Sequence, residues 1–392
     1  MDKRVYLDHA ATTALRPEAL EAMQPYLTSA FGNAGTLYRE GKEARQALEE
    51  ARATIANVIG AHPPEIVFTS GGTEANNAII AGIVRGLHHT RGREKSGKHV
   101  ISSAFEHHAV LEPLNALKRH GYEVTLARPR RDGRLHVEAL AEKIREDTVF
   151  VSIMTVQNEL GTVQPITELA QVTHEDNAFF HTDAVQALGK IPFRVMQLGV
   201  DAASFSAHKV GGPAGVGAFY LRQQTPFRPS LLGGGQEGGR RSGTQNVAGA
   251  VGFAKAVELA DKERKETAQQ IADLRDRLAK GLLAADSRIT LTVPLDSSDP
   301  ATSKQVPGIV SFLVKGFESE TLILKLDEAG FAVSGGSACS TGSLDPSHVL
   351  MSIGLTRDEA YSALRVSLGS ENTKDEADAF IRAFGEIVKA VR

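Results

Sequence analysis

The chain has 392 residues, a formal net charge of −3 and one cysteine, and its length favours two domains or one large α/β domain over a single small core. The balanced charge gives no sign of nucleic acid or an anionic membrane as a partner, and one cysteine excludes an internal disulfide and a multi-cysteine metal site. Because the start lacks the apolar run of a signal peptide and no stretch approaches the roughly 20 apolar residues of a membrane span, we expect a cytoplasmic protein.

Strand-like and helix-like patterns alternate through the first 220 residues. Helices are expected at 16–27 and at 41–59, where apolar residues recur at helical spacing. Further helices are expected at 71–86, at 109–120 and between the fourth and fifth strands. The expected strands are 65–69, 98–103, 123–127, 149–154, 178–182, 202–206 and 217–221. This rhythm predicts an α/β fold in which a mainly parallel sheet of about seven strands lies between layers of helices.

The pattern changes near residue 250. A long charged helix at 251–283 leads into shorter elements that indicate a smaller α+β domain. The segment 294–307 is rich in proline, serine and aspartate and predicts an exposed loop. We therefore expect a large domain at 15–255 and a small domain formed by 1–14 and 256–392. The elements expected in the small domain are strands at 289–293, 308–314, 331–334 and 363–368, and helices at 319–329 and from 373.

One lysine stands out by its position in this pattern. Lys209 follows an apolar strand and His208, and it precedes a glycine-rich turn. Partial burial favours the neutral amine of a lysine, which can then form a Schiff base with an aldehyde cofactor. For these residues alone, a surface lysine at a strand-to-loop junction is an equally good interpretation.

Other polar residues also follow strands, where ligands bind in open α/β sheets. Gly72 and Thr73 open a helix and suit a phosphate, although this turn can also be a simple helix cap. His107 can stack on a flat ring or move protons, or it can be a solvated loop histidine. Asp183 can keep an aromatic nitrogen base protonated, or it can cap the next helix.

Together these residues match the needs of a pyridoxal phosphate enzyme. Such an enzyme requires a lysine for the cofactor aldehyde, an acid for the pyridine nitrogen, a stacked ring, a donor for the phenolate oxygen and a phosphate cup. A dehydrogenase needs a different glycine signature and a zinc hydrolase needs closer-spaced ligands, which disfavours both classes. The chain supplies the set at successive strand ends, as Lys209, Asp183, His107, Asn158 or Gln186, and Gly72 with Thr73.

The single cysteine lies in a segment of small, polar and glycine residues, 334–343. A lone cysteine is most often a small buried hydrophobic residue. The composition around Cys339 instead predicts a mobile loop that solvent reaches, where a thiol can react.

These motifs resemble those of the cysteine desulfurases, within the fold-type I, aspartate aminotransferase-like pyridoxal phosphate enzymes (class V aminotransferases). The likeness covers nearly the whole chain, beginning with YLDHAATT at 6–13. The cysteine segment, with SACS at 337–340 and its extension to 350, resembles the group I (NifS/IscS-like) branch, and the RxGHHC pattern of the other branch is absent. Further matching motifs lie at 69–77, 157–164, 181–190, 204–209, 233–246, 334–350 and 364–369.

The resemblance implies a role for each cofactor residue. Lys209 is expected to form the Schiff base and to act as the base, and Asp183 to face the pyridine nitrogen. His107 is expected to stack on the cofactor and to shuttle protons. Thr244 matches a residue that reaches the phosphate in the partner subunit, which implies a homodimer. The remaining cofactor contacts are Asn158, the phenolate donor Gln186, and a phosphate cup of Gly72, Thr73, Ser206 and His208.

The resemblance also implies a reaction. L-Cysteine is converted to L-alanine, with Arg365 and Asn158 holding the substrate and Cys339 receiving the sulfur as a persulfide. The sulfur then passes to an acceptor protein such as an iron–sulfur scaffold. No resident metal is expected, only a transient iron–sulfur contact through Cys339.

Two alternatives stay open. One is a selenocysteine lyase, or another lyase or aminotransferase on the same fold; the other is a catalytically silent scaffold. The full cofactor set together with Cys339 disfavours both. The chain departs from the family pattern at His9, Tyr38 and Gly238, where Asn, His and Arg are common, and these changes bear on the geometry of the entrance.

Overall fold

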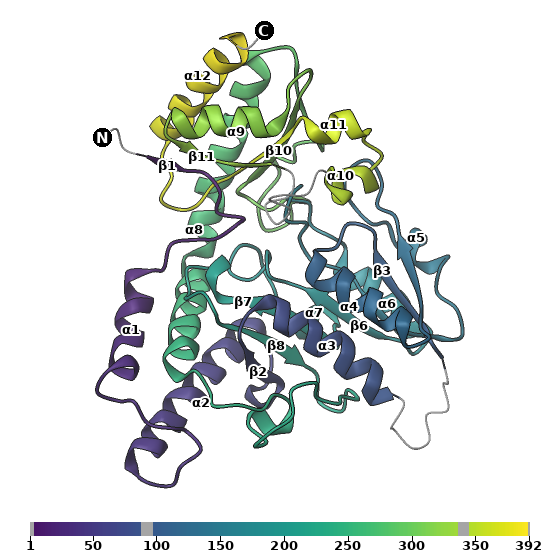
Figure 1. Cartoon of the computed structure of the whole chain (residues 1–392), viewed down its shortest axis with the longest axis vertical. Helices are drawn as coiled ribbons and strands as arrows, with labels where there is room; N and C mark the ends of the chain where they lie inside the picture. The colour runs from purple at the N-terminus through teal and green to yellow at the C-terminus, as the bar shows by residue number, and fades with distance from the viewer. Residues whose placement is uncertain (1–3, 88–96, 336–344, 391–392) are drawn as a thin grey trace.

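The computed structural model describes residues 4–87, 97–335 and 345–390, which form a larger unit and a smaller one (Figure 1). The larger unit is built on a seven-stranded sheet with the order β2-β8-β7-β6-β5-β3-β4. β8 is antiparallel to both of its neighbours, and the other pairings are parallel. The strands are β2 (Ile66–Thr69), β3 (His99–Ser103), β4 (Glu123–Ala127), β5 (Thr148–Ser152), β6 (Phe179–Asp183), β7 (Ala202–Ser206) and β8 (Gly217–Leu221).

Helices cover both faces of this sheet, and the strand sequences show why. Adjacent residues of a strand point to opposite faces, and both faces are covered here, so nearly every residue of the central strands is buried, small polar residues such as Ser102 and Ser152 included. Phe68 packs into the core cluster that includes α2, whereas its neighbour Val67 packs into the cluster that includes α3 and α4. The helices of this unit are α1 (Pro17–Leu27), α2 (Arg39–Ile59), α3 (Gly72–Leu87), α4 (His108–Arg119), α5 (Val137–Ala141), α6 (Ile166–Glu175) and α7 (Val195–Leu198).

The smaller unit has its own core. An antiparallel sheet of order β12-β13-β10-β9 packs against helices, and β1 near the start of the chain pairs with β11. Phe312 and Phe384 meet edge to face, with ring centroids 5.5 Å apart. The elements are β1 (Val5–Tyr6), β9 (Ile289–Leu291), β10 (Ile309–Val314), β11 (Phe331–Ala332), β12 (Ser334–Gly335), β13 (Ala363–Ser367), α9 (Ser319–Glu328), α10 (His348–Ser352), α11 (Arg357–Tyr361) and α12 (Lys374–Ala390).

One long helix, α8 (Val247–Ala285), runs from the larger unit into the smaller one (Figure 1). Its start is capped by the Asn246 side chain, which accepts a hydrogen bond from the Gly249 amide. Phe253 and Val257 belong to the core of the larger unit, and Leu278 belongs to that of the smaller one. The helix therefore contributes to both cores, and the predicted boundary near residue 255, inside α8, stays a proposal. Across the described ranges, no helix is long and apolar enough to cross a membrane.

The predicted α/β fold with a seven-stranded, mainly parallel sheet and a smaller α+β unit is confirmed. The prediction of an exposed loop at 294–307 is wrong for its last residues. Gln305 and Val306 are buried, and the Gln305 side chain accepts a hydrogen bond from the Asp296 amide. Proline and aspartate indicated a turn correctly, but composition does not show whether a turn lies against a core. Short helices such as α5 and α11 were not predicted, because five residues are too few to show helical periodicity.

Candidate active site

A cavity of about 370 Å³ lies beyond the carboxyl ends of the parallel strands, where ligands bind in open α/β folds. The cavity is closed on one side by the smaller unit, through Arg365 of β13 and His348 of α10. Thr244 does not line this cavity, and Cys339 lies outside the described residues. The predicted site residues that the structure brings together here are Gly72, Thr73, His107, Asn158, Asp183, Gln186, Ser206, His208, Lys209 and Arg365.

Lys209 is held at the edge of this cavity by local structure. The buried strand β7 ends at Ser206, and a short 3-10 helix, η2 (Ala207–Lys209), turns the lysine toward the N-terminal segment. Its amine donates to the backbone carbonyls of Ala10 and Ala11, at 2.7 and 2.6 Å. These two carbonyls fix the amine at the cavity wall while leaving it reachable from inside.

Asp183, at the end of β6, is 5 % exposed. Its carboxylate accepts hydrogen bonds from Asn76 Nδ2 at 2.7 Å and from the Val185 amide at 2.9 Å. No helix of the described chain begins directly after Asp183, so the helix-cap interpretation does not apply. Sequence reasoning missed Asn76, although its position one turn after Gly72 was a usable signal, because residues one turn apart share a helix face.

His107 is the N-cap of α4, and its Nδ1 accepts a hydrogen bond from the Ala109 amide at 3.0 Å. Since Nδ1 accepts, the proton of the neutral ring lies on Nε2. Burial lowers the pKa of His107, the Asp183 carboxylate opposes this, and Lys209 adds to it. The neutral, flat imidazole suits stacking on an aromatic cofactor.

The turn before α3 has the shape expected of a phosphate cup. A side chain at Gly72 would place its Cβ 2.8 Å from Val185 and 3.4 Å from Ser206, so glycine permits this close approach. Gly72 and Thr73, the first residues of α3, line the cavity together with Ser206, and the first amides of a helix have no partner within the helix. Burial, with contributions from Lys209 and Lys190, lowers the pKa of His208 to about 4, so this ring is a neutral hydrogen-bonding group near pH 7.

Arg365 projects from β13 into the other side of the cavity and is 1 % exposed. Its guanidinium donates to Asp8 Oδ1 at 2.7 Å and to the Asn158 carbonyl at 3.0 Å. Its Nε is buried and has no hydrogen-bond partner. A buried, unsatisfied guanidinium N–H beside a cavity is suited to a substrate carboxylate. Sequence reasoning singled out Arg365 but missed its anchor, Asp8.

Two buried glutamates, Glu159 and Glu106, contact the residues just before and at the start of α10. Ser347 donates to Glu159 Oε2 at 2.6 Å, and His348 Nε2 donates to the Glu106 carbonyl at 2.8 Å. Burial raises the pKa of Glu159 to about 7 and that of Glu106 to about 8. Neither acid was a sequence-based candidate, because the burial that raises each pKa comes from the tertiary fold and is not visible in the sequence.

The raised pKa of Glu106 predicts a pH-dependent stability. Above pH 4.5 the unfolded chain loses this proton while the folded protein keeps it to about pH 8, so stability falls as pH rises through that window. Glu106→Gln keeps an acceptor for Ser103 and Met154 and removes the titration. We expect the variant to gain roughly 2–4 kcal/mol over the original protein at pH 8 and little at pH 4.5, measured by denaturant unfolding. Equal gains at both pH values would contradict this.

Thr244 lies elsewhere, on an exposed loop near the base of the phosphate turn. Three residues earlier, Arg241 donates to both carboxylate oxygens of Glu74, in the first turn of α3. This ion pair holds the loop that carries Thr244 against the element that forms the phosphate cup. Thr244 does not line the cavity of its own chain. This is compatible with the prediction that it contacts the phosphate bound in a partner subunit.

The residues present fit pyridoxal phosphate. A buried carboxylate, a neutral imidazole, a reachable amine and a glycine turn with open helix amides surround one cavity, and each corresponds to one part of the cofactor. In the described part of the chain, no group of three histidine, aspartate or glutamate side chains has the arrangement of a metal site. The fold and the cavity therefore define a fold-type I pyridoxal phosphate enzyme.

Comparison with known proteins gives the family. The Aminotransferase class-V model matches residues 5–380. A protein called cysteine desulfurase IscS, from Dictyoglomus turgidum, is 43 % identical over 100 % of this chain and 96 % of its own length. A solved NifS-like protein is 37 % identical with a TM-score of 0.90, covering 99 % of this chain and 100 % of its own. A structure described as SspA in complex with cysteine is 34 % identical with a TM-score of 0.79, covering 94 % and 100 %. The chain belongs to the class-V aminotransferase family.

Proposed function

We propose that this protein is a cysteine desulfurase, which converts L-cysteine to L-alanine and places the sulfur on Cys339 as a persulfide. The observation that carries the proposal is where the described residues before and after the segment with Cys339 lie. The described residues on either side of it meet the cofactor cavity, since Ser334 pairs with Arg365 in the sheet and His348 lines the cavity. The cysteine desulfurases among its relatives support the same activity.

Four residues prepare the substrate in this proposal. Arg365 binds the cysteine carboxylate through its unsatisfied Nε, with Asn158 beside it. Pyridoxal phosphate, when bound, supplies an electron sink that makes the substrate Cα–H bond acidic. The Lys209 amine accepts the Cα proton, and His107 Nε2 holds a proton on the neighbouring wall.

Sulfur transfer then needs the thiolate of Cys339. Its sulfur attacks the substrate sulfur, so an S–S bond forms while the substrate Cβ–S bond breaks, with the electron pair remaining on carbon. The carbon takes up a proton and leaves as alanine. The sum is cysteine plus protein thiol giving alanine plus protein persulfide, with no external oxidant or reductant. We further propose delivery to an acceptor protein such as an iron–sulfur scaffold in the cytoplasm.

The test is a single-turnover reaction. The cofactor-loaded protein is mixed with an equal amount of L-cysteine, alanine is measured, and the protein is digested for mass spectrometry. We expect alanine in proportion to protein and one added sulfur atom on the peptide that contains Cys339. Alanine without persulfide would favour a lyase that needs no protein thiol, and release of alanine from selenocysteine alone would favour the selenocysteine lyase.

A homodimer is part of the proposal, because Thr244 is exposed and does not line the cavity of its own chain. Leu231 and Leu232 are 49 % and 77 % exposed, and the Ser242 amide donates to the Leu231 carbonyl at 3.3 Å, so two adjacent exposed leucines lie beside the loop that carries Thr244. Exposed apolar groups that lie together can mark an interface. We expect light scattering to give twice the chain mass, and Leu232→Glu to weaken the dimer by about tenfold or more. Leu324→Glu, at a leucine of α9 that is 66 % exposed, is the matched control. A fully active monomer would rule out a shared site.

A further inference from the structure

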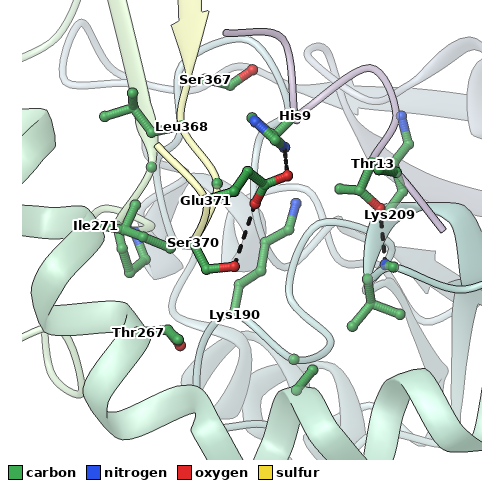
Figure 2. Close-up of a pocket in the computed structure, with 18 of the residues that line it drawn as sticks. His9, Thr13, Lys190, Lys209, Thr267, Ile271, Ser367, Leu368, Ser370 and Glu371 are labelled. Carbon is green, nitrogen blue, oxygen red and sulfur yellow. Dashed lines mark hydrogen bonds and ion pairs between the residues drawn. The ribbon is translucent and has the colours of Figure 1, made fainter. Parts of the chain in front are cut away.

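A second cavity, of about 380 Å³, lies behind the active site (Figure 2). Ala10 and Lys209 line both cavities, so they form the wall between them. Figure 2 shows the Lys190 side chain extending into this cavity between Lys209 and the pair formed by His9 and Glu371. Lys190 takes no part in the reaction steps proposed for the active site, although it lies on the other side of the wall that Ala10 and Lys209 form.

Lys190 fixes the direction in which a cofactor-site amide points. Its ammonium group donates to Gln186 Oε1, while Gln186 Nε2 donates to the Ala10 carbonyl at 2.8 Å. An ammonium only donates and a carbonyl only accepts, so both contacts require the same orientation of the Gln186 amide. The amide nitrogen carries two N–H groups, and the Ala10 carbonyl takes one. Because Gln186 also lines the cofactor cavity, the other N–H is available there.

The charges around Lys190 are mostly positive. Burial, with repulsion from Lys209 and Arg365, lowers the pKa of Lys190 to about 7. Lys190 in turn helps to lower the pKa of both His208 and His9. Two carboxylates line this cavity, Glu18 and Glu371, and Glu371 is half exposed and lies 3.7 Å from His9 Nδ1. A half-buried cation in such surroundings is stabilised by an anion on the cofactor side, and a phenolate oxygen is such an anion.

We propose that Lys190 is a positioning residue for the cofactor, which holds the Gln186 amide with an N–H toward the phenolate oxygen and places positive charge behind it. The inference deepens the proposed function and rests on its cofactor site, but it does not depend on Cys339. Lys190 acts through Gln186 and through its charge, and it forms no bond with the substrate.

The experiment compares Lys190→Met with Lys190→Arg, which keeps the charge and the donors. Two quantities are measured: the pH midpoint of the visible absorption change of the cofactor-loaded protein, and the affinity of the apoprotein for pyridoxal phosphate by equilibrium dialysis. Loss of the cation is expected to raise the midpoint by about one pH unit and to weaken binding by about tenfold. The arginine variant is expected to keep both near the original values. Lys190→Gln provides the same comparison if the methionine variant does not fold.

A double-variant cycle separates positioning from general structural damage. In a Gln186→Leu background, Lys190→Met is expected to weaken cofactor binding less than in the original protein, because the amide is gone and only the effect of the charge remains. Lys255→Met, at a partly exposed lysine that pairs with Glu258 on α8, is the control and is expected to change neither quantity. An unchanged midpoint in Lys190→Met, or an equal loss of affinity in both backgrounds, would overturn the proposal. Alanine release by the unaltered protein tests the desulfurase function separately.

Discussion

Lys209→Ala is expected to abolish the visible absorption band of lysine-bound cofactor and to lower alanine release by at least about a hundredfold. The reason is structural: two backbone carbonyls hold the Lys209 amine at the cavity wall, which Asp183 and His107 also line. The change removes both the covalent attachment and the base. The measurement is an absorption spectrum and an alanine assay on the same purified sample.

The control for this variant is Lys255→Ala, which removes a partly exposed lysine of α8 and its ion pair with Glu258. Such a surface pair contributes little, so spectrum and activity are expected to stay unchanged. Non-covalent binding of the cofactor to Lys209→Ala is expected to persist, since Asp183 and the phosphate turn remain. A normal lysine-bound spectrum in Lys209→Ala would assign the cofactor to another amine.

Strong periodic patterns explain why most of the fold was predictable. The central strands are buried on both faces, and α2 has apolar residues at helical spacing along its buried side, so hydrophobic pattern alone indicates both. The short elements escaped prediction because five residues hold too little pattern. The end of the segment 294–307 escaped for another reason: Val306 is buried by contacts with distant parts of the chain, which local composition does not encode.

The cavity residues were predictable because each follows a strand, and the ends of parallel strands meet at one edge of the sheet. Their pairings with supporting residues were not predictable. Asn76 holds Asp183 across 107 positions of the sequence, and Asp8 holds Arg365 across 357. Such pairs follow from the tertiary fold, so a single sequence gives no means of pairing them. The chemical roles of the cavity residues stay predictions that the variants above test.

The structure accounts for two of the three departures from the family pattern. Gly238 has φ 63°, in the left-handed region where glycine is unstrained and an arginine is not. His9 is 5 % exposed and faces Glu371 across 3.7 Å, so an imidazole fills a buried place on the second cavity. Tyr38 is 60 % exposed, and nothing in the structure explains its replacement of histidine.

Cys339→Ser is expected to separate cofactor chemistry from sulfur chemistry. Cys339 is the only thiol of the chain, so any persulfide on the protein must form there. A serine hydroxyl has nearly the size of a thiol but stays protonated near pH 7 and is a poor nucleophile toward sulfur. The variant is expected to bind pyridoxal phosphate and to show the spectral change on adding cysteine, because the cavity residues are intact. Alanine release is expected to fall by on the order of a hundredfold or more.

The matched control is Ser340→Ala, which alters the neighbouring residue and keeps the thiol, and it is expected to retain alanine release. Spectra, alanine and persulfide are measured on both variants at equal cofactor content, so that a loss of binding is not mistaken for a loss of sulfur transfer. Cofactor and substrate binding do not need the thiol, whereas sulfur transfer does. One sample of Cys339→Ser is therefore expected to show normal binding spectra and little alanine. Near-normal alanine output from Cys339→Ser would make the thiol structural and would favour a lyase that releases sulfur directly.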